Sequence, residues 1–166
     1  MSLPVKTATM CYFRRADDIW VMDYRKHNHP LHAGKFAPPG GKRNDEETLE
    51  ECIIREVFEE TGMKISSVKL RGQVLFFNER RTFGGKPAKN DWQVYVYECY
   101  NFDESKARPT EGKFVRIKKE EIESIPMHEG DRKILDWLLQ NKGGIFNARI
   151  EHVGEQLASA VFDKMD

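Results

Sequence analysis

Runs of alternating apolar and polar residues predict a series of β-strands along this chain. Near the start, two β-rich runs are separated only by Arg14–Asp18, and this arrangement predicts a hairpin. Four later runs have the same character and favour further strands. The predicted strands are Thr7–Phe13, Ile19–Tyr24, Lys64–Phe77, Trp92–Phe102, Lys113–Ile117 and Ile145–Val153.

Other stretches have the periodicity of helices. Thr48 and Glu51 have the spacing of a capping box, and Gly62 stands where a C-terminal cap is expected. Strand runs interrupted by isolated helices favour the α+β class, with a mixed β-sheet flanked by helices. The predicted helices are Thr48–Thr61, Lys118–Ser124 and Asp131–Gln140.

Three polar or Pro/Gly-rich segments predict loops. Arg25–Lys35 carries His27, His29 and His32, which form no ligand set with a nearby carboxylate or cysteine. Phe36–Gly41 (FAPPGG) is a corner of prolines and glycines that cannot be helical. The third segment runs from Asn78 to Asp91 and carries four cationic residues: Arg80, Arg81, Lys86 and Lys89.

Composition narrows the class of protein. The chain has 166 residues, with 27 Lys+Arg and 27 Asp+Glu, and this length predicts a single domain over residues 1–166. A net charge of zero argues against a broad nucleic-acid or membrane-binding surface. No apolar stretch approaches the ~20 residues that a bilayer requires, and no signal peptide is evident. Cys11, Cys52 and Cys99 are widely spaced and expected to be reduced thiols, so we expect a cytoplasmic protein without a membrane partner.

The segment Gly41–Met63 carries the clearest chemical signal. At ~100° per residue from Leu49, its apolar side chains fall between about 40° and about 180°, which predicts the buried face. Its carboxylates fall on the adjoining face, between about 280° and about 20°, within reach of one point above the helix. The predicted buried face is Ile53, Ile54, Val57 and Phe58, and the acidic face is Glu56, Glu59 and Glu60.

Three neighbouring carboxylates repel one another, and a divalent cation relieves that repulsion. Hard oxygen ligands at a partly hydrated site favour Mg²⁺, or alternatively Mn²⁺, over Zn²⁺. Arg55 precedes Glu59 by four residues, so it can pair with that carboxylate and orient it. A solvated acidic helix face is the alternative interpretation of the same residues.

The spacing of the segment distinguishes these alternatives. It reads G-x5-E-x7-R-E-U-x-E-E-x-G-U, where U is a bulky apolar residue, and it resembles a complete Nudix box. Outside the box, TATMCYF, GKFAPPGGK, EGKFVRI, IPMHEGDRKILDWLL and IFNARIEHVG resemble the MutT-like oxidised-purine nucleoside triphosphatases. The resemblance implies the Nudix α/β/α sandwich. The box positions are Gly41, Glu47, Arg55, Glu56, Val57, Glu59, Glu60, Gly62 and Met63.

Nudix hydrolases cut a nucleoside diphosphate linked to another group, with Mg²⁺ bound on this helix. The resemblance therefore implies that Glu56, Glu59 and Glu60 are metal ligands, helped by a backbone carbonyl near Gly40 or Gly41. It also implies that Glu59 or Glu60 is the general base.

Further roles follow from the same resemblance. Arg55 is expected to orient Glu59, and Glu111 resembles a glutamate that in some members contributes to metal or water activation. Glu47 is expected to support the loop and the helix by hydrogen bonds. Gly41 and Gly62 are expected to be structural.

The resemblance also indicates where the substrate binds. Ala37 stands where the closest relatives have asparagine, and His128 where many have tryptophan, so the preferred base stays open. Asp131 is expected to bind a purine edge, to cap its own helix, or to do both. The implied reaction converts purine nucleoside triphosphates, such as oxidised 8-oxo-dGTP, to nucleoside monophosphate and pyrophosphate. The expected substrate-binding residues are Phe36, Ala37, Lys42, His128 and Asp131.

Two other functions remain open. The basic loop Asn78–Asp91 can hold the phosphates of an RNA 5′ end, which would make the protein an RNA pyrophosphohydrolase. A non-catalytic nucleotide-binding module is the second alternative, although such modules usually lose box glutamates that this chain keeps. Phe76 and Trp92 are expected in the core rather than as stacking platforms for a base.

Overall fold

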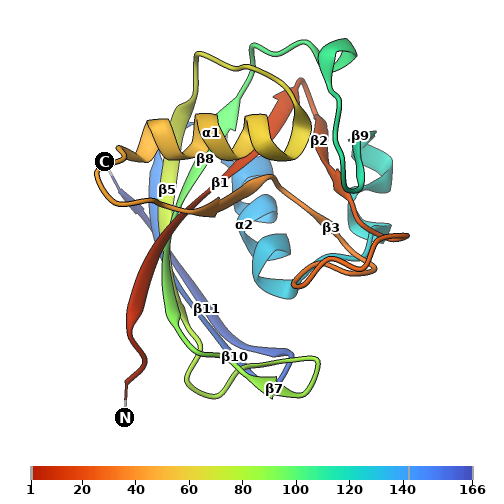
Figure 1. Cartoon of the computed structure of the whole chain (residues 1–166). Helices are drawn as coiled ribbons and strands as arrows, with labels where there is room; N and C mark the ends of the chain where they lie inside the picture. Colours follow the sequence, from red (N-terminus) through yellow and green to blue (C-terminus); the bar gives the residue numbers. More distant parts are fainter. Residues whose placement is uncertain (1, 142, 166) are drawn as a thin grey trace.

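The computed structural model describes residues 2–141 and 143–165. It consists of many strands and two α-helices, the arrangement of an α+β protein (Figure 1). The helices are α1 (Leu49–Thr61) and α2 (Glu129–Gln140), with two short 3-10 helices, η1 (Glu104–Lys106) and η2 (Lys119–Ser124). The strands are β1 (Val5–Arg15), β2 (Asp18–Asp23), β3 (Phe36–Ala37), β4 (Gly40–Lys42), β5 (Lys69–Phe77), β6 (Thr82–Phe83), β7 (Lys86–Pro87), β8 (Asp91–Cys99), β9 (Lys113–Ile117), β10 (Ile145–Val153) and β11 (Gln156–Met165).

One mixed sheet organises the molecule. Its strand order is β11-β10-β5-β8-β1-β2-β3, with β4 also paired to β1 and β9 to β2. β1 runs parallel to β8 and β10 runs parallel to β5, whereas the other pairs in the sheet are antiparallel. The helices α1 and α2 lie on opposite faces of this sheet (Figure 1). The predicted α+β class with a flanked mixed sheet is therefore confirmed.

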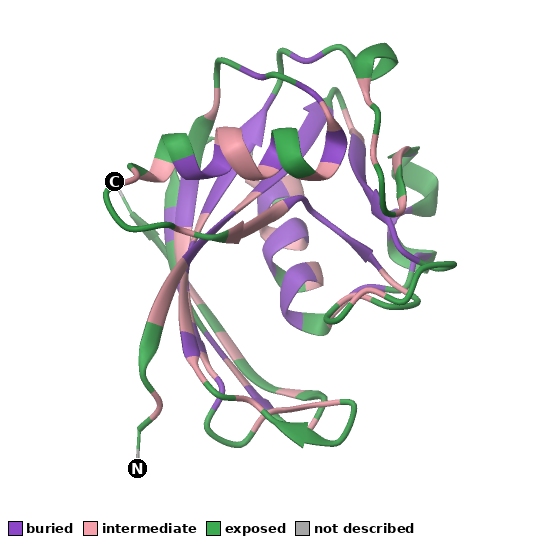
Figure 2. Ribbon diagram, viewed as in Figure 1, coloured by how far each residue is buried: buried purple, intermediate pink, exposed green. Residues whose placement is uncertain are grey.

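The core has two layers because successive side chains of a strand point to opposite faces. In β1, Tyr12 packs with the residues of α2, while Phe13 packs with Ile53 and Val57 of α1. Buried residues accordingly occupy the middle of the sheet and the inner sides of both helices, as Figure 2 shows. Within the described residues, no helix has the length and apolar character needed to cross a membrane.

Several predicted boundaries were wrong. The strand predicted from Lys64 begins only at Lys69, because residues 64–68 carry the chain from the end of α1 to the sheet. The strand predicted to end at Phe102 ends at Cys99, and the helix predicted over 118–124 is the 3-10 helix η2. The polar loop Asn78–Asp91 contains the small hairpin β6–β7.

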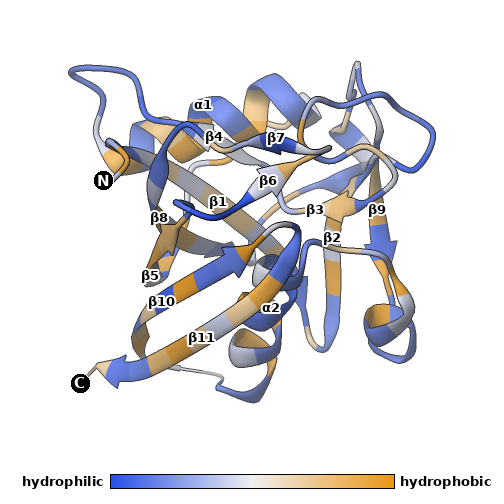
Figure 3. Ribbon diagram, turned by 90° about the horizontal axis from the view of Figure 1, so that it is seen from below, coloured by the Kyte–Doolittle hydropathy of each residue, from blue (hydrophilic) through white to orange (hydrophobic). Residues whose placement is uncertain are grey.

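The strand β11 was not predicted at all. It follows a turn at Gly154, whose φ of 61° suits glycine, and it pairs antiparallel with β10 at the edge of the sheet. Because small residues such as Ala158 and Ser159 interrupt its apolar positions, its alternation is weaker than that of β10 (Figure 3). An edge strand exposed along much of its length gives only a faint sequence signal.

A buried ion cluster joins three strands to the end of α2. Glu98 of β8 accepts from Arg14 Nη1 at 2.8 Å, forms an ion pair with Arg71, and accepts from the Tyr100 hydroxyl at 2.9 Å. Glu98 and Arg71 are fully buried. Arg14 also donates to the Leu138 carbonyl, so strand cations neutralise the partial negative charge at the C-terminal end of α2.

We expect Glu98→Gln to lower the free energy of unfolding by about 3–5 kcal/mol, because it leaves two buried guanidinium groups without a countercharge. Urea unfolding followed by circular dichroism measures this loss. Glu123→Gln, at an exposed position on η2, is the control and should change stability by less than about 0.5 kcal/mol. A loss below about 1 kcal/mol for Glu98→Gln would contradict the assignment of the cluster.

Candidate active site

The acidic helix α1 is rotated relative to its predicted orientation. Its buried residues are Cys52, Ile53, Val57 and Thr61, which span an arc from about 300° to about 120° around the helix. The prediction that Phe58 belongs to the buried face was wrong, since this side chain is 46% exposed. The helix contacts β1 and β4, and its buried side therefore includes the positions of two of the three glutamates.

This rotation separates the three glutamates by burial. Glu56 and Glu60 fall inside the buried arc, and the side chain of Glu56 is only 14% exposed. Glu59 falls just outside the arc, and its side chain is 55% exposed. The same helix face thus presents two sheltered carboxylates and one solvated carboxylate.

Glu60 lies against the loop that precedes the helix. Its Oε2 accepts a hydrogen bond from the Gly40 amide at 2.8 Å. Burial, together with the negative charges of Glu56, Glu59 and Glu111, raises the pKa of the Glu60 carboxyl to about 8, although the Gly40 hydrogen bond acts in the opposite direction. Glu111 itself is exposed, but it lies close enough for its charge to act on Glu60.

Arg55 connects the acidic face to the preceding loop. Its Nη1 donates to Glu56 at 2.9 Å and to Glu59 at 3.1 Å, and its Nη2 donates to the Lys42 carbonyl at 3.0 Å. Glu47 accepts from Arg55 Nε at 2.6 Å and from Nη2 at 2.9 Å. These hydrogen bonds lower the pKa of Glu47 to about 2, so this carboxylate stays ionised.

Two glycines of the box are required by close packing. A Cβ on Gly41 would lie 2.5 Å from the carboxyl carbon of Glu56, so a larger residue here would displace this carboxylate from its place against the loop. Gly62 ends α1 with a φ of 78°, and its amide donates to the Phe58 carbonyl. At the other end, Thr48 and Glu51 form the predicted capping box.

The acidic face does not form a closed cage in this structure. Among the described residues, no group of three or more histidine, cysteine, aspartate or glutamate side chains converges to hold a metal ion. In this structure the carboxylates are bound by donors of the chain itself: Arg55 Nη1 bridges Glu56 and Glu59, and the Gly40 amide binds Glu60. The set nevertheless fits a divalent cation chemically: it offers hard oxygen donors and a concentrated negative charge that raises the pKa of Glu60.

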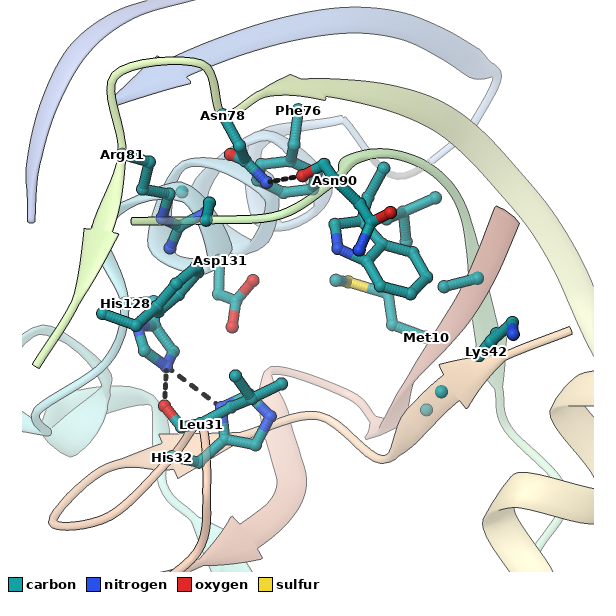
Figure 4. A pocket seen from close by; sticks show the side chains of 18 of the residues that line it. Met10, Leu31, His32, Lys42, Phe76, Asn78, Arg81, Asn90, His128 and Asp131 are labelled. Atoms are coloured by element: carbon teal, nitrogen blue, oxygen red, sulfur yellow. Dashed lines mark hydrogen bonds between the residues drawn. The ribbon is translucent and has the colours of Figure 1, made fainter. Parts of the chain in front are cut away.

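A cavity of about 550 Å³ opens beside this loop. Its walls come from β1, β5 and β8, from the β6–β7 hairpin and from the beginning of α2 (Figure 4). Its edge is lined by strand β4, which consists of Gly40, Gly41 and Lys42. The same strand contacts Arg55 and Glu60 of the acidic helix, so the cavity and the helix adjoin each other. Phe76 and Trp92, which were expected only in the core, also line it.

The structure brings some predicted substrate residues together and not others. Lys42, His128 and Asp131 line the cavity, but Phe36 and Ala37 do not. Both of these are buried in the core, where the ring of Phe36 lies under Arg25. Phe36 packs in the core with Ile134 and Leu135 of α2, whereas Ala37 packs with Met22 and Tyr24.

Asp131 does not cap its helix as predicted. The helix α2 begins at Glu129, and His128 is the N-cap residue, so Asp131 lies in the first turn. Its side chain points into the cavity in Figure 4, and the residue is 9% exposed. Burial raises the pKa of Asp131, while the positive charges of His128 and Arg81 act in the opposite direction.

Two residues line the cavity that the sequence placed only in loops: Arg81, considered for RNA phosphates, and His32, considered without a ligand role. Arg81 projects from the β6 side toward Asp131, with its guanidinium 4.4 Å from the ring centroid of Phe83 (Figure 4). His32 Nδ1 lies 3.0 Å from His128 Nε2, which also lies 2.9 Å from the Leu31 carbonyl. Burial lowers the pKa of His32 to about 3. No sequence signal links His32 to His128, since 96 residues separate them.

Comparisons with known proteins agree with this architecture. A family model described as the NUDIX domain matches residues 4–138. The uncharacterized Nudix hydrolase YvcI of Bacillus subtilis is 28% identical over 111 residues, which are 66% of this chain and 68% of that protein.

Solved structures share the fold at low identity. A mutator MutT protein from Bacillus halodurans superposes with a TM-score of 0.75 at 22% identity, covering 95% of this chain and 97% of that one. A MutT protein from Methanosarcina mazei gives a TM-score of 0.64 at 21% identity, covering 84% and 96%.

The raised pKa of Glu60 predicts a pH dependence of stability in the metal-free protein. The carboxyl titrates near 8 in the folded state and near 4.5 in the unfolded chain, so the folded state binds the extra proton between these values. The free energy of unfolding should therefore fall as pH rises from about 5 to about 7.5, by about 3 kcal/mol more than in Glu60→Gln. Urea unfolding at both pH values measures the difference. Glu120→Gln should behave as wild type, and parallel curves for wild type and Glu60→Gln would refute the prediction.

Proposed function

The chain belongs to the Nudix hydrolase family, and on that basis we propose that it is a Mg²⁺-dependent pyrophosphohydrolase of purine nucleoside triphosphates. Oxidised nucleotides such as 8-oxo-dGTP are among the proposed substrates. Water would cleave between the α- and β-phosphates to give nucleoside monophosphate and pyrophosphate. The observation that carries the proposal is the cavity beside the acidic helix, which supplies room for a base next to carboxylates suited to hold a cation.

The geometry supports separate binding regions for the base and for the phosphates of the substrate. Phe76, Trp92 and Met10 provide apolar and aromatic surface in the cavity, which suits a base. Lys42 lies at the edge of the cavity on the loop that leads to α1, where its charge can attract a phosphate. A triphosphate would therefore extend from the cavity toward the acidic face.

Nudix hydrolases use a divalent metal, and we assign it here to Glu56, Glu59, Glu60 and the Gly41 carbonyl. When bound, Mg²⁺ would screen the phosphate charge and lower the pKa of a water molecule. Arg55 orients Glu56 and Glu59 through its Nη1, and Glu47 holds Arg55 in place. Gly41 allows the loop to pack on Glu56 without a steric clash.

Carboxylates on the acidic face of α1 would also accept the proton from the attacking water. We assign the general base to Glu59 or Glu60, and the surroundings of Glu60 favour proton uptake near neutral pH. Glu111 contributes negative charge beside Glu60 and is proposed to assist activation of the metal or water.

We expect Glu59→Gln and Glu60→Gln each to reduce Mg²⁺-dependent turnover by about 100-fold or more, since each removes a negative oxygen from the acidic face. Pyrophosphate release measures turnover, and circular dichroism checks that the fold is intact. Glu50→Gln, which also changes an exposed glutamate on α1, is the matched control. Unchanged activity in both variants would overturn the metal assignment.

The substrate class is tested by one panel at equal concentration with Mg²⁺. It contains dNTPs, 8-oxo-dGTP, 2-hydroxy-dATP, nucleotide sugars, dinucleoside polyphosphates and RNA with a 5′ triphosphate. We expect the highest kcat/KM on purine nucleoside triphosphates, because the cavity accepts a base beside Lys42.

The panel also separates the alternatives. The RNA alternative draws on Lys86 and on Lys89, which lines the cavity, in the basic loop. Pyrophosphate release mainly from RNA would replace the proposed function with an RNA 5′ pyrophosphohydrolase. Nucleotide binding without turnover of any member would identify a binding module.

A further inference from the structure

A second cavity, of about 650 Å³, lies at the turn between β1 and β2. It shares no lining residue with the cavity beside the acidic helix. Its lining holds three cationic side chains and one carboxylate, so its surroundings attract anions. The lining residues are Arg14, Arg15, Ala16, Asp17, Lys69 and Tyr100.

One wall of this cavity is a buried arginine with an unused edge. Arg14 is only 6% exposed, and its Nη1 already donates to Glu98 and to the Leu138 carbonyl. Its Nε is buried without a hydrogen-bonding partner, and its Nη2 forms no hydrogen bond or ion pair with any described residue. Buried donors are normally satisfied, so this edge is suited to an acceptor that a ligand supplies.

The shape of that edge favours an oxyanion. The Nε and Nη2 groups of an arginine donate in parallel and can bind two oxygens of one anion. Arg55 shows this arrangement in the same molecule, where Nε and Nη2 donate to the two carboxylate oxygens of Glu47. The corresponding edge of Arg14 binds no carboxylate of the described chain.

The other charges of the cavity are mostly paired. Asp17 forms an ion pair with Lys119 at 3.7 Å, and Arg15 forms one with Glu104 at 2.6 Å. The ammonium group of Lys69, by contrast, forms no hydrogen bond or ion pair within the described part of the chain. Lys69 is exposed at the start of β5, so its charge is available to a ligand in the cavity.

Positive charge is in excess around this cavity. In the buried ion cluster, the single carboxylate of Glu98 faces both Arg14 and Arg71, so one guanidinium charge stays uncompensated. Lys69 adds a second uncompensated charge. An anion with two negative charges would balance both, and partial burial strengthens that attraction relative to an open surface.

We propose that this cavity binds a phosphate group through the Nε–Nη2 edge of Arg14 and the ammonium group of Lys69. A phosphate group carries up to two negative charges near neutral pH and presents several acceptor oxygens. Inorganic phosphate offers this group, and so does the pyrophosphate that the proposed reaction would release. The site itself does not depend on the proposed function, and its ligand would connect the ends of β1 and β5.

The test is a titration of the full chain with potassium phosphate, without divalent cations and against potassium chloride of equal ionic strength. Nitrogen–proton correlation NMR follows the Nε–H signal of Arg14, which is assigned by its loss in Arg14→Lys, and calorimetry gives the affinity. We expect a saturable shift of this signal and binding weakened by about tenfold or more in Arg14→Lys and in Lys69→Met. Lys133→Met, at an exposed position of α2 outside both cavities, is the matched control and should bind as wild type.

A parallel titration with pyrophosphate distinguishes the two sources of the group. Tighter binding of pyrophosphate at the Arg14 signal would assign the site to the reaction product, and equal or weaker binding would assign it to inorganic phosphate. The inference is wrong if neither anion shifts the Arg14 signal saturably, or if Lys69→Met binds as wild type or no more weakly than Lys133→Met.

Turnover separates this site from the proposed active site. Lys69→Met should keep kcat/KM on purine nucleoside triphosphates within about twofold of wild type, because the two cavities share no lining residue. A larger loss would overturn the separation of the sites. Absence of turnover in wild type would refute the hydrolase assignment, while the Arg14 signal would still report binding of phosphate.

Discussion

The packing of α1 against β1 and β4 controls the chemistry of the acidic face. By turning Glu56 and Glu60 inward, it places two like charges where water screens them poorly. Arg55, which Glu47 holds in place, and the Gly40 amide counter this repulsion by donating hydrogen bonds, and Gly41 leaves room for the arrangement. The remaining repulsion between the carboxylates of Glu56 and Glu60 is one that a bound divalent cation would relieve.

Much of this fold could be predicted from the sequence because its signals are local. The capping box of Thr48 and Glu51, the terminal Gly62 and the strand Lys113–Ile117 were all found where the pattern placed them. The angular position of Phe58 could not be predicted, since a helical wheel gives spacing but not the element that covers the helix. The neighbours β1 and β4 decide that orientation.

The cavity was harder to predict than the acidic helix, and the reason is physical. The box is one continuous segment, whereas the cavity combines side chains from β1, from the β6–β7 hairpin and from α2. Asp131 and Lys42 were selected by resemblance and line this space, but Arg81 was considered only as part of a basic loop. Phe36 and Ala37 were expected beside the substrate; both are buried on β3, which pairs with β2, and neither lines the cavity.

The bridge between Arg81 and Gly154 has a consequence for how the protein is divided along its length. The carboxylates of α1 lie within the segment matched by the family model, which ends at residue 138. Gly154 lies beyond it, in the turn between β10 and β11, yet its β-bridge with Arg81 holds the backbone of a residue that lines the cavity. Because β6 depends on this contact, shortening or replacing the turn between β10 and β11 would displace one wall of the cavity while leaving the carboxylates of α1 in place.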